Sequence, residues 1–274
     1  MSVPAPTSEA GRAALAGLLV SPSGALLGLD FDGTLAPIVD EPDRARVHPD
    51  IPPVLRLLAA LGVRVAVVTG RPAAFPVQPG GLTDVPGLVV LGHYGAERWE
   101  GGVLSAPDPD KGVAEARRRL TALLADVAAP DGTYVEDKGR AVAVHTRRTA
   151  EPGAAFDALR GPLTELAEET GLVVEPGRYV LELRAAGGDK GDALRVLVAE
   201  SAPSVVVFVG DDLGDLPAFA AVERLRADGI PGLLVCSGST EVSALSDLAD
   251  LVVDGPEGVA GLLRALVESA HANR

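Results

Sequence analysis

Aromatic side chains, cysteine and positive charge are all scarce in this 274-residue sequence. Aromatic residues make up 3% of the chain against 47% for all hydrophobic types, so the core has to be built from Val, Leu and Ala. The single cysteine, Cys236, excludes an internal disulfide. Because it ends the apolar run Gly232-Leu233-Leu234-Val235-Cys236, we expect a buried strand position rather than a reactive thiol.

The shortage of basic residues excludes a class of partner. The chain has 24 Lys and Arg against 38 Asp and Glu, a formal net charge of -14. Proteins that bind nucleic acid need a basic stripe to neutralise phosphates. The longest basic run, Arg117-Arg118-Arg119, lies in a helical pattern, where a solvated helix face is the expectation. The sequence therefore predicts no nucleic-acid partner.

Long apolar runs are also missing. No stretch approaches the roughly 20 apolar residues that span a bilayer. The N-terminus lacks the basic start and apolar core of a signal peptide. We therefore expect a cytoplasmic protein without a membrane partner. A monomer is a separate expectation.

What the sequence does contain is a series of short runs rich in Val and Leu, each ending near Gly or Asp. Such runs are typical of strands buried on both faces, and helical patterns separate most of them. This alternation predicts an α/β fold with a doubly wound parallel sheet. The expected strands are 25–30, 63–70, 88–92, 205–210, 233–237 and 251–254, and the expected helices are 9–20, 50–62, 190–201, 215–222, 240–247 and 256–270.

The middle of the chain follows another pattern. Residues 98–184 are predicted as helix (111–128), strands (133–138 and 140–147), helix (155–171) and strands (172–176 and 178–184). Gly139 and Gly177 fall where tight turns would join the strand pairs. We therefore expect an inserted αββαββ domain over 98–184 and a core domain formed by 1–97 and 185–274.

The most informative motif is Asp30-Phe31-Asp32-Gly33-Thr34-Leu35, directly after the first expected strand. Carboxylates at i and i+2 lie on the same side of an extended segment, where their repulsion favours a bound cation. Oxygen ligands of this kind suit Mg²⁺. Because Asp-Gly is also a common turn dipeptide, a capped turn and a metal site are equally consistent with this motif alone.

Three further signals follow strands or begin a helix. Gly210-Asp211-Asp212-Leu213-Gly214-Asp215 places acids at another strand end, although an Asp N-cap would explain one of them. Val67-Val68-Thr69-Gly70-Arg71 offers a hydroxyl and backbone N–H groups suited to phosphate, and is also an ordinary strand exit. In Gly188-Asp189-Lys190-Gly191, the lysine could neutralise a phosphate or lie in solvent.

In this order, the four motifs resemble those of the haloacid dehalogenase superfamily of phosphatases. The resemblance implies that Asp30 attacks phosphorus to form an aspartyl-phosphate and that Asp32 is the general acid and base. It further implies that Mg²⁺ is held by Asp30, the main-chain carbonyl of Asp32, and Asp211, with Asp215 orienting Lys190 or a water on the metal. The residues that it implies for the phosphate are Thr69, Gly70, Arg71 and Lys190.

The inserted segment resembles the cap domain of trehalose-6-phosphate phosphatases. The similar stretches are Val135-Glu136-Asp137-Lys138-Gly139, Val144-His145-Thr146-Arg147 and Val180-Leu181-Glu182-Leu183-Arg184, together with Gly92-His93-Tyr94-Gly95-Ala96-Glu97 in the core. The resemblance implies that the sugar hydroxyls are contacted by Glu136, Lys138, Arg147 and Glu182. One departure is that Gly214 and Leu216 replace the Thr and Glu of the usual GDDxTDE motif.

The expected function is hydrolysis of trehalose 6-phosphate to trehalose and phosphate. Two alternatives remain. The same chemistry could act on another sugar phosphate, such as sucrose phosphate, a glucosylglycerol-type phosphate or a pseudodisaccharide phosphate. The chain could also be a catalytically retired domain that binds a sugar phosphate and regulates a partner, although a pure binder has no need of an acid at position 32.

Overall fold

The computed structural model describes residues 3–39, 41–108, 110–238 and 243–272. It divides the chain into two compact units. The core unit comprises residues 1–106 and 188–274, and the inserted unit comprises residues 107–187. Within the described part of the chain, every helix is too short or too polar to span a bilayer.

The core unit is built on an eight-stranded sheet in the order β12-β11-β10-β1-β2-β3-β4-β5. The six strands from β12 to β3 are parallel, and β4 and β5 join at one edge as antiparallel strands. The central strands are buried on both faces because they consist almost wholly of Val, Leu, Ala and Gly. The strands are β1 (Ala25–Leu29), β2 (Arg64–Val68), β3 (Val89–Gly92), β4 (Glu97–Glu100), β5 (Val103–Ser105), β10 (Val205–Gly210), β11 (Gly232–Gly238) and β12 (Leu251–Asp254).

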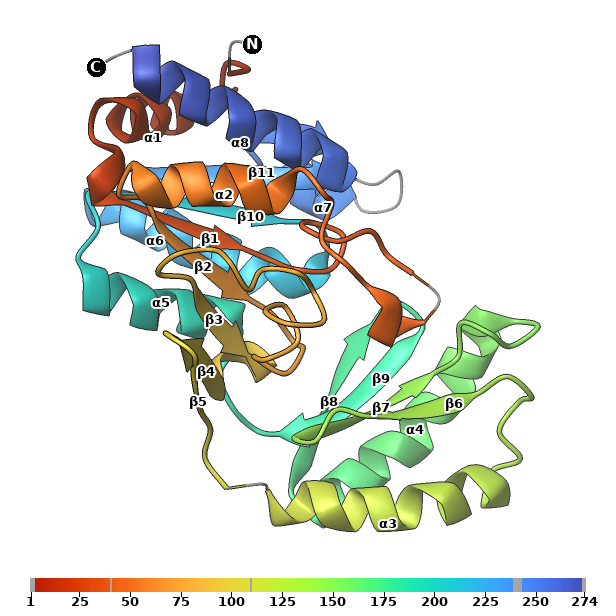
Figure 1. The fold of residues 1–274 in the computed structure, drawn as a ribbon. Coiled ribbons are helices and arrows are strands. Elements are labelled where there is room, and N and C mark those ends of the chain that lie inside the picture. Colours follow the sequence, from red (N-terminus) through yellow and green to blue (C-terminus); the bar gives the residue numbers. More distant parts are fainter. Residues whose placement is uncertain (1–2, 40, 109, 239–242, 273–274) are drawn as a thin grey trace. The chain divides into compact units, whose positions relative to one another are not determined.

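Helices cover this sheet on both faces, as Figure 1 shows. One apolar layer packs α1, α2 and α8 against the sheet, and the other packs α5 and α6 against the opposite face. This arrangement confirms the doubly wound α/β core predicted from the sequence. The helices are α1 (Glu9–Val20), α2 (Ile51–Ala60), α5 (Lys190–Ser201), α6 (Leu216–Ala227), α7 (Ser243–Ser246) and α8 (Gly255–Ala272), with 3₁₀ turns η1 (Pro22–Gly24), η2 (Pro42–Arg44), η3 (His93–Gly95) and η4 (Leu213–Asp215).

The inserted unit has the αββαββ order predicted for it. Its four-stranded antiparallel sheet has the order β6-β7-β9-β8. Leu and Val side chains of β7 and β9 pack against α3 and α4 on one face. On the other face lie Ala141, Ala143 and His145 of β7 and Glu182 and Arg184 of β9. The elements are α3 (Lys111–Asp126), β6 (Tyr134–Asp137), β7 (Ala141–His145), α4 (Pro152–Thr170), β8 (Leu172–Gly177) and β9 (Val180–Ala185).

Two features differ from the sequence expectations. Residues 97–105, assigned mostly to the inserted domain, form β4 and β5 at the edge of the core sheet. The missed signal is Gly101-Gly102, whose positive φ angles (59° and 86°) suit the two-residue turn of this hairpin. Of the helix expected over 240–247, α7 spans Ser243–Ser246, and 240–242 lie outside the described residues.

Asp250 ties the start of the chain to the sheet. Its buried carboxylate pairs with Arg226 of α6, accepts a hydrogen bond from Ser8 at the start of α1, and accepts another from the backbone N–H of Leu234 at 2.8 Å. The starts of α1 and β11 and the end of α6 are therefore joined through one carboxylate, which is 1% exposed.

We predict that Asp250→Ala lowers the free energy of unfolding by about 3 kcal/mol, because it leaves the Leu234 N–H and the Arg226 guanidinium short of a buried partner. Urea unfolding followed by circular dichroism measures the change. Glu115→Ala, which breaks the exposed Glu115–Arg118 pair, is the control and is expected to match the wild type within error. Equal unfolding midpoints for the wild type and Asp250→Ala would contradict the anchoring role.

Candidate active site

Neighbouring parallel strands bring the predicted core residues to one edge of the sheet. β10, β1 and β2 lie side by side in register, and their carboxyl ends lead into Asp211, Asp30 and Thr69 respectively. Ligands of open α/β sheets bind at this edge. The structure therefore places three segments that are distant in the sequence at the position expected for a site.

A buried lysine, Lys190, links the carboxylates of Asp30 and Asp215. The Nζ atom of Lys190 lies 2.7 Å from Oδ1 of Asp30 and 2.8 Å from Oδ1 of Asp215. Lys190 is the first residue of α5, whose start is fixed by a capping box between Asp189 and Asp192. All three charged side chains of the link are at least nine-tenths buried.

The acidic residues of the two motifs form a cluster that fits a divalent cation. Carboxylate oxygens of Asp30, Asp211 and Asp215 all lie within 4.8 Å of one another. Burial, only partly offset by Lys190, raises the pKa of Asp30 to about 8. Burial and the neighbouring Asp30 carboxylate raise the pKa of Asp211 to about 10. Negative charge is thus in excess, and oxygen donors of this kind suit a hard cation.

Asp215 holds Lys190 and the backbone of Asp211 in place through hydrogen bonds. One of its carboxylate oxygens contacts Lys190, and the other accepts hydrogen bonds from the backbone N–H groups of Asp211 (2.9 Å) and Asp212 (3.3 Å). Its side chain is fully buried, so it fixes the backbone that presents Asp211. At the departures noted above, Gly214 donates its N–H to Asp212 and Leu216 packs into the apolar layer under α5 and α6.

Gly33 allows Asp211 to approach the first motif. A Cβ atom built at Gly33 would lie 1.9 Å from Oδ2 of Asp211, and the glycine has a φ of +74°. Thr34 donates a hydrogen bond to the other oxygen of Asp211 at 3.4 Å. The glycine of this motif is therefore required both for its backbone conformation and for the space that it leaves.

Asp32, the second acid of the motif, pairs with an arginine. The Nε and Nη2 atoms of Arg71 lie 2.6 and 2.7 Å from the two carboxylate oxygens of Asp32. The sequence placed Arg71 with the phosphate-binding residues, whereas in the structure its guanidinium holds Asp32. Thr69 is buried, and its hydroxyl accepts a hydrogen bond from the Arg71 N–H at 3.1 Å, which leaves the hydroxyl proton to donate. Gly70 lies between them, close to the Tyr94 ring.

Three of the four residues predicted to contact sugar lie on the helix-free face of the inserted sheet. Lys138 and Glu182 form an ion pair with 2.5 Å between Nζ and Oε2. The other oxygen of Glu182, Oε1, is buried and has no hydrogen-bond partner among the described residues. Glu136 contacts the His145 ring at 2.7 Å. Arg147, the fourth, follows β7 and is partly buried.

This face also carries two rings for which the sequence predicts no role. Tyr134 and His145 are cross-strand neighbours whose rings stack with 4.5 Å between centroids, and the Arg148 guanidinium lies over the Tyr134 ring. Two-residue alternation along β6 puts Tyr134, Glu136 and Lys138 on one side, which the sequence does show. The partner His145 depends on the register of β6 with β7, which it does not show.

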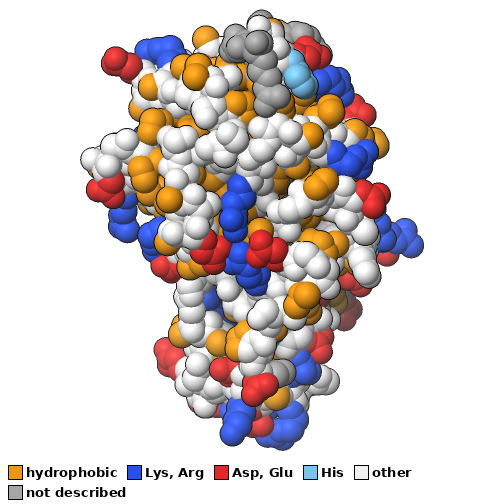
Figure 2. Space-filling view, turned by 60° about the vertical axis from the view of Figure 1, so that its left-hand side comes forward, with side chains coloured by type: hydrophobic (Ala, Val, Ile, Leu, Met, Phe, Trp, Pro, Cys, Tyr) orange, Lys and Arg blue, Asp and Glu red, His pale blue; other side chains and the backbone are white. Residues whose placement is uncertain are grey.

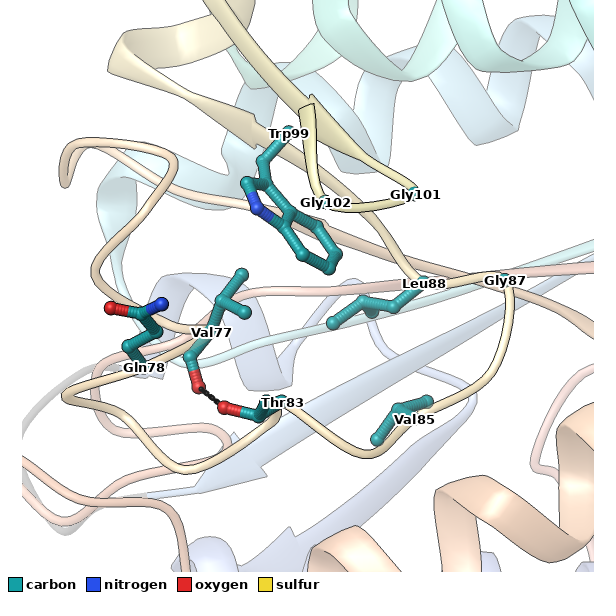
Figure 3. Close-up of a pocket in the computed structure, with 9 residues that line it drawn as sticks. All are labelled: Val77, Gln78, Thr83, Val85, Gly87, Leu88, Trp99, Gly101 and Gly102. Atoms are coloured by element: carbon teal, nitrogen blue, oxygen red, sulfur yellow. Dashed lines mark hydrogen bonds between the residues drawn. The ribbon is translucent and has the colours of Figure 1, made fainter. Parts of the chain in front are cut away.

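A hollow in the core unit contains none of the predicted site residues. It measures about 440 Å³, and Figure 3 shows the Trp99 ring above the apolar side chains of Val77 and Leu88. None of its lining residues is an acid, a base or a strong metal ligand. It is lined by Val77, Gln78, Thr83, Val85, Gly87, Leu88, Trp99, Gly101 and Gly102.

Surface charge follows the composition. On the face drawn in Figure 2, the described basic side chains are scattered among acidic ones and form no continuous stripe.

Comparison with known proteins gives the family. A model described as trehalose-phosphatase matches residues 28–251, a span that includes all the motifs above. The chain belongs to the trehalose-phosphatase family. A probable trehalose-phosphate phosphatase of Sinorhizobium fredii is 32% identical over 208 residues, which cover 73% of this chain and 74% of that protein. An uncharacterised glycosyl hydrolase of Mycobacterium tuberculosis is 38% identical over 221 residues, 74% of this chain but only 15% of that protein.

The fold of the family is also found among solved structures. A trehalose-6-phosphate phosphatase related protein superposes with a TM-score of 0.71 and 23% identity, covering 91% of this chain and 100% of that one. At 23% identity, this superposition shows that the two chains share a fold. Together with the family match, it confirms the resemblance inferred from the motifs.

The contact between Gly33 and Asp211 generates a test of the cation site. We predict that MgCl₂ raises the melting temperature of the wild type by roughly 5–10 °C at saturation, and that Gly33→Ala removes this rise, because the added methyl group displaces Asp211. Differential scanning fluorimetry with and without MgCl₂ measures both.

Gly171→Ala is the matched control for this test. Its φ of +71° imposes the same left-handed strain, about 1–2 kcal/mol, but a Cβ at Gly171 would meet nothing within 4 Å. It should lower the melting temperature and keep the full response to MgCl₂. A normal response in Gly33→Ala would show that the three carboxylates are not the cation site.

Proposed function

We propose that the chain is a magnesium-dependent phosphatase that hydrolyses trehalose 6-phosphate to trehalose and phosphate. The observation that carries the proposal is the cluster of the buried Asp30, Lys190 and Asp215 with the half-buried Asp211 in a chain of the trehalose-phosphatase family. Burying charge costs free energy, and groups with strongly shifted pKa values cluster at binding and catalytic sites. The substrate remains part of the proposal because the chain spans only 15% of the length of one relative.

The nucleophile in this proposal is Asp30. Lys190 contacts its Oδ1 atom, which leaves Oδ2 to attack phosphorus. The Oδ2–P bond forms as the bond between phosphorus and the sugar oxygen breaks, and Asp32 gives the proton that the leaving sugar alkoxide needs. Transfer through a carboxylate divides one difficult displacement into two easier ones.

The second step releases phosphate. Asp32, now a carboxylate, takes a proton from the water that attacks the aspartyl-phosphate, and the P–Oδ2 bond breaks to restore Asp30. Proton transfer of this kind contributes roughly 10²–10⁴ in rate. Lys190 and the Thr69 hydroxyl donate hydrogen bonds to the phosphate oxygens throughout. Mg²⁺, held by Asp30, Asp211 and the main-chain carbonyl of Asp32, would supply positive charge opposite the transferring phosphoryl group.

The polar face of the inserted unit is our candidate for sugar recognition. Lys138 offers donors, Glu136 offers acceptors, and Glu182 has a buried oxygen without a partner among the described residues. A sugar hydroxyl both donates and accepts, so it satisfies such groups, and a substrate without it leaves them buried and unpaired. Arg147 completes the proposed set.

We predict that Asp30→Asn lowers phosphate release from trehalose 6-phosphate by at least about 10³-fold, because the amide is a poor nucleophile. A colorimetric phosphate assay with MgCl₂ measures it. Asp84→Asn, which neutralises an exposed carboxylate in the same unit, is the control.

A panel of sugar phosphates under the same conditions tests the substrate. We expect trehalose 6-phosphate to be preferred over sucrose phosphate, glucosylglycerol phosphate and a pseudodisaccharide phosphate. Preference for one of these would refute the trehalose assignment and retain the chemistry. Binding without Mg²⁺-dependent turnover of any ester would instead favour a regulatory domain.

We also predict that Glu182→Gln raises KM for trehalose 6-phosphate about 10–100-fold, the effect of losing a hydrogen bond to a charged group. The kinetic constants for p-nitrophenyl phosphate, which has no sugar, should stay unchanged. Asp137→Asn is the control, because this residue faces the helix side of the same sheet and pairs with Arg117. Equal losses on both esters would exclude a role in sugar recognition.

A further inference from the structure

The pair formed by Arg71 and Asp32 is unusually complete. Its two nitrogen–oxygen contacts, 2.6 and 2.7 Å, are those of a bidentate fork. The third guanidinium nitrogen, Nη1, donates to the main-chain carbonyl of Pro42 at 2.9 Å. Every nitrogen of the guanidinium is therefore engaged within the core unit.

Two aromatic rings lie close to the same guanidinium. Its central carbon lies 4.2 Å from the centroid of the Phe75 ring and 5.6 Å from that of Phe31, and the two rings meet edge to face. The chain has only 5 Phe residues, and two of them lie here. Because the Arg71 side chain is 12% exposed and that of Asp32 is 33% exposed, the arginine is the more firmly embedded partner.

The backbone of Arg71 is fixed as well. The N–H groups of His93 and Tyr94 donate to the carbonyls of Arg71 (3.0 Å) and Thr69 (3.1 Å), and the Ala73 N–H donates to the buried Glu97 carboxylate (2.9 Å). His93 and Tyr94 both have positive φ angles, 46° and 59°. Non-glycine residues keep such angles only where the surrounding structure imposes them.

From these contacts we propose that Arg71 is a positioning residue for Asp32 and not a ligand of the phosphate. The proposal rests on the function proposed above. Arg71 fixes the plane of the Asp32 carboxylate, so that the same group is aligned with the leaving sugar oxygen in the first step and with the attacking water in the second. Each carboxylate oxygen has two lone-pair sites, so the pair with Arg71 leaves one site on each oxygen. That site is available for the proton that Asp32 gives in the first step and takes in the second.

The Gly92–Glu97 segment supports Arg71 in this role. Gly92 has no room for a side chain, since a Cβ there would lie 2.3 Å from the Ala73 nitrogen. The close approach allows the Gly92–Glu97 segment to form hydrogen bonds with the backbone on both sides of Arg71. Through Arg71, this segment helps to position the Asp32 carboxylate.

Leaving-group chemistry tests the proposal. A sugar alkoxide needs a proton from Asp32, whereas p-nitrophenolate departs without one. We expect Arg71→Met to lower kcat/KM, which reports only the first transfer, by about 10²-fold for trehalose 6-phosphate, the lower end of general acid–base contributions, and by less than about 5-fold for p-nitrophenyl phosphate. The inhibition constant of inorganic phosphate should stay within about 3-fold of wild type, because no phosphate contact is lost.

A double-mutant cycle separates this role from a purely structural one. In an Asp32→Asn background, Arg71→Met should cause no further loss on trehalose 6-phosphate, because the group that it positions no longer acts. Arg44→Met, at an exposed arginine in η2, is the control. If Arg71→Met does not fold, Phe75→Leu replaces it, since it removes the ring under the guanidinium and should give the same selective loss to a smaller degree.

The outcomes against the proposal are distinct. Equal losses of kcat/KM on both esters, a rise of 10-fold or more in the phosphate inhibition constant, or losses that multiply in the Asp32→Asn background would each overturn it and leave the phosphatase function standing. If the wild type hydrolyses neither ester, both proposals are wrong.

Discussion

The ammonium group of Lys190, held between the carboxylates of Asp30 and Asp215, is the interaction on which the core unit's site depends. Three acids surround one lysine here, and burial is the main cause that raises the pKa of Asp30 and of Asp211, with the neighbouring carboxylates adding to it. Burial alone would lower the pKa of Lys190, but Asp215 and Asp30 more than reverse this and raise it well above its usual value. The cluster is therefore stable only with its lysine charged, and it has capacity for a further cation.

Two glycines near the charged residues allow other parts of the site to come close to them. Gly33 admits the Asp211 carboxylate, and Gly92 admits the Ala73 backbone beside Arg71. In both places a methyl group would enter the space of an atom that the site requires. A motif such as Asp30-Phe31-Asp32-Gly33 thus combines reacting groups with steric conditions, and Phe31 adds a ring near the guanidinium that holds Asp32.

How far the sequence predicted this arrangement depends on the range of each interaction. The core strands were predictable because they are apolar runs. The acids that follow them were predictable as a site because neighbouring parallel strands bring their carboxyl ends together. The β4–β5 hairpin was missed although Gly101-Gly102 marks its turn. Arg71 follows Thr69 and Gly70 and was grouped with them, whereas its contact with Asp32 crosses 39 positions. The same limit applies to His145, whose partner Glu136 is set by strand register.

The two units handle charge in different ways, and this difference bears on specificity. In the core unit the acids outnumber the single lysine, so a cation and a phosphate can be added without breaking existing pairs. On the polar face of the inserted unit, Lys138 with Glu182 and Glu136 with His145 are already matched. If the sugar binds this face as proposed, its hydroxyls replace these contacts, so the net gain per contact is small and depends on correct geometry. Oε1 of Glu182 is the exception, since it is buried without a partner among the described residues and gains from any donor placed there. Affinity would then come chiefly from the phosphate, and discrimination between sugars from a few such atoms.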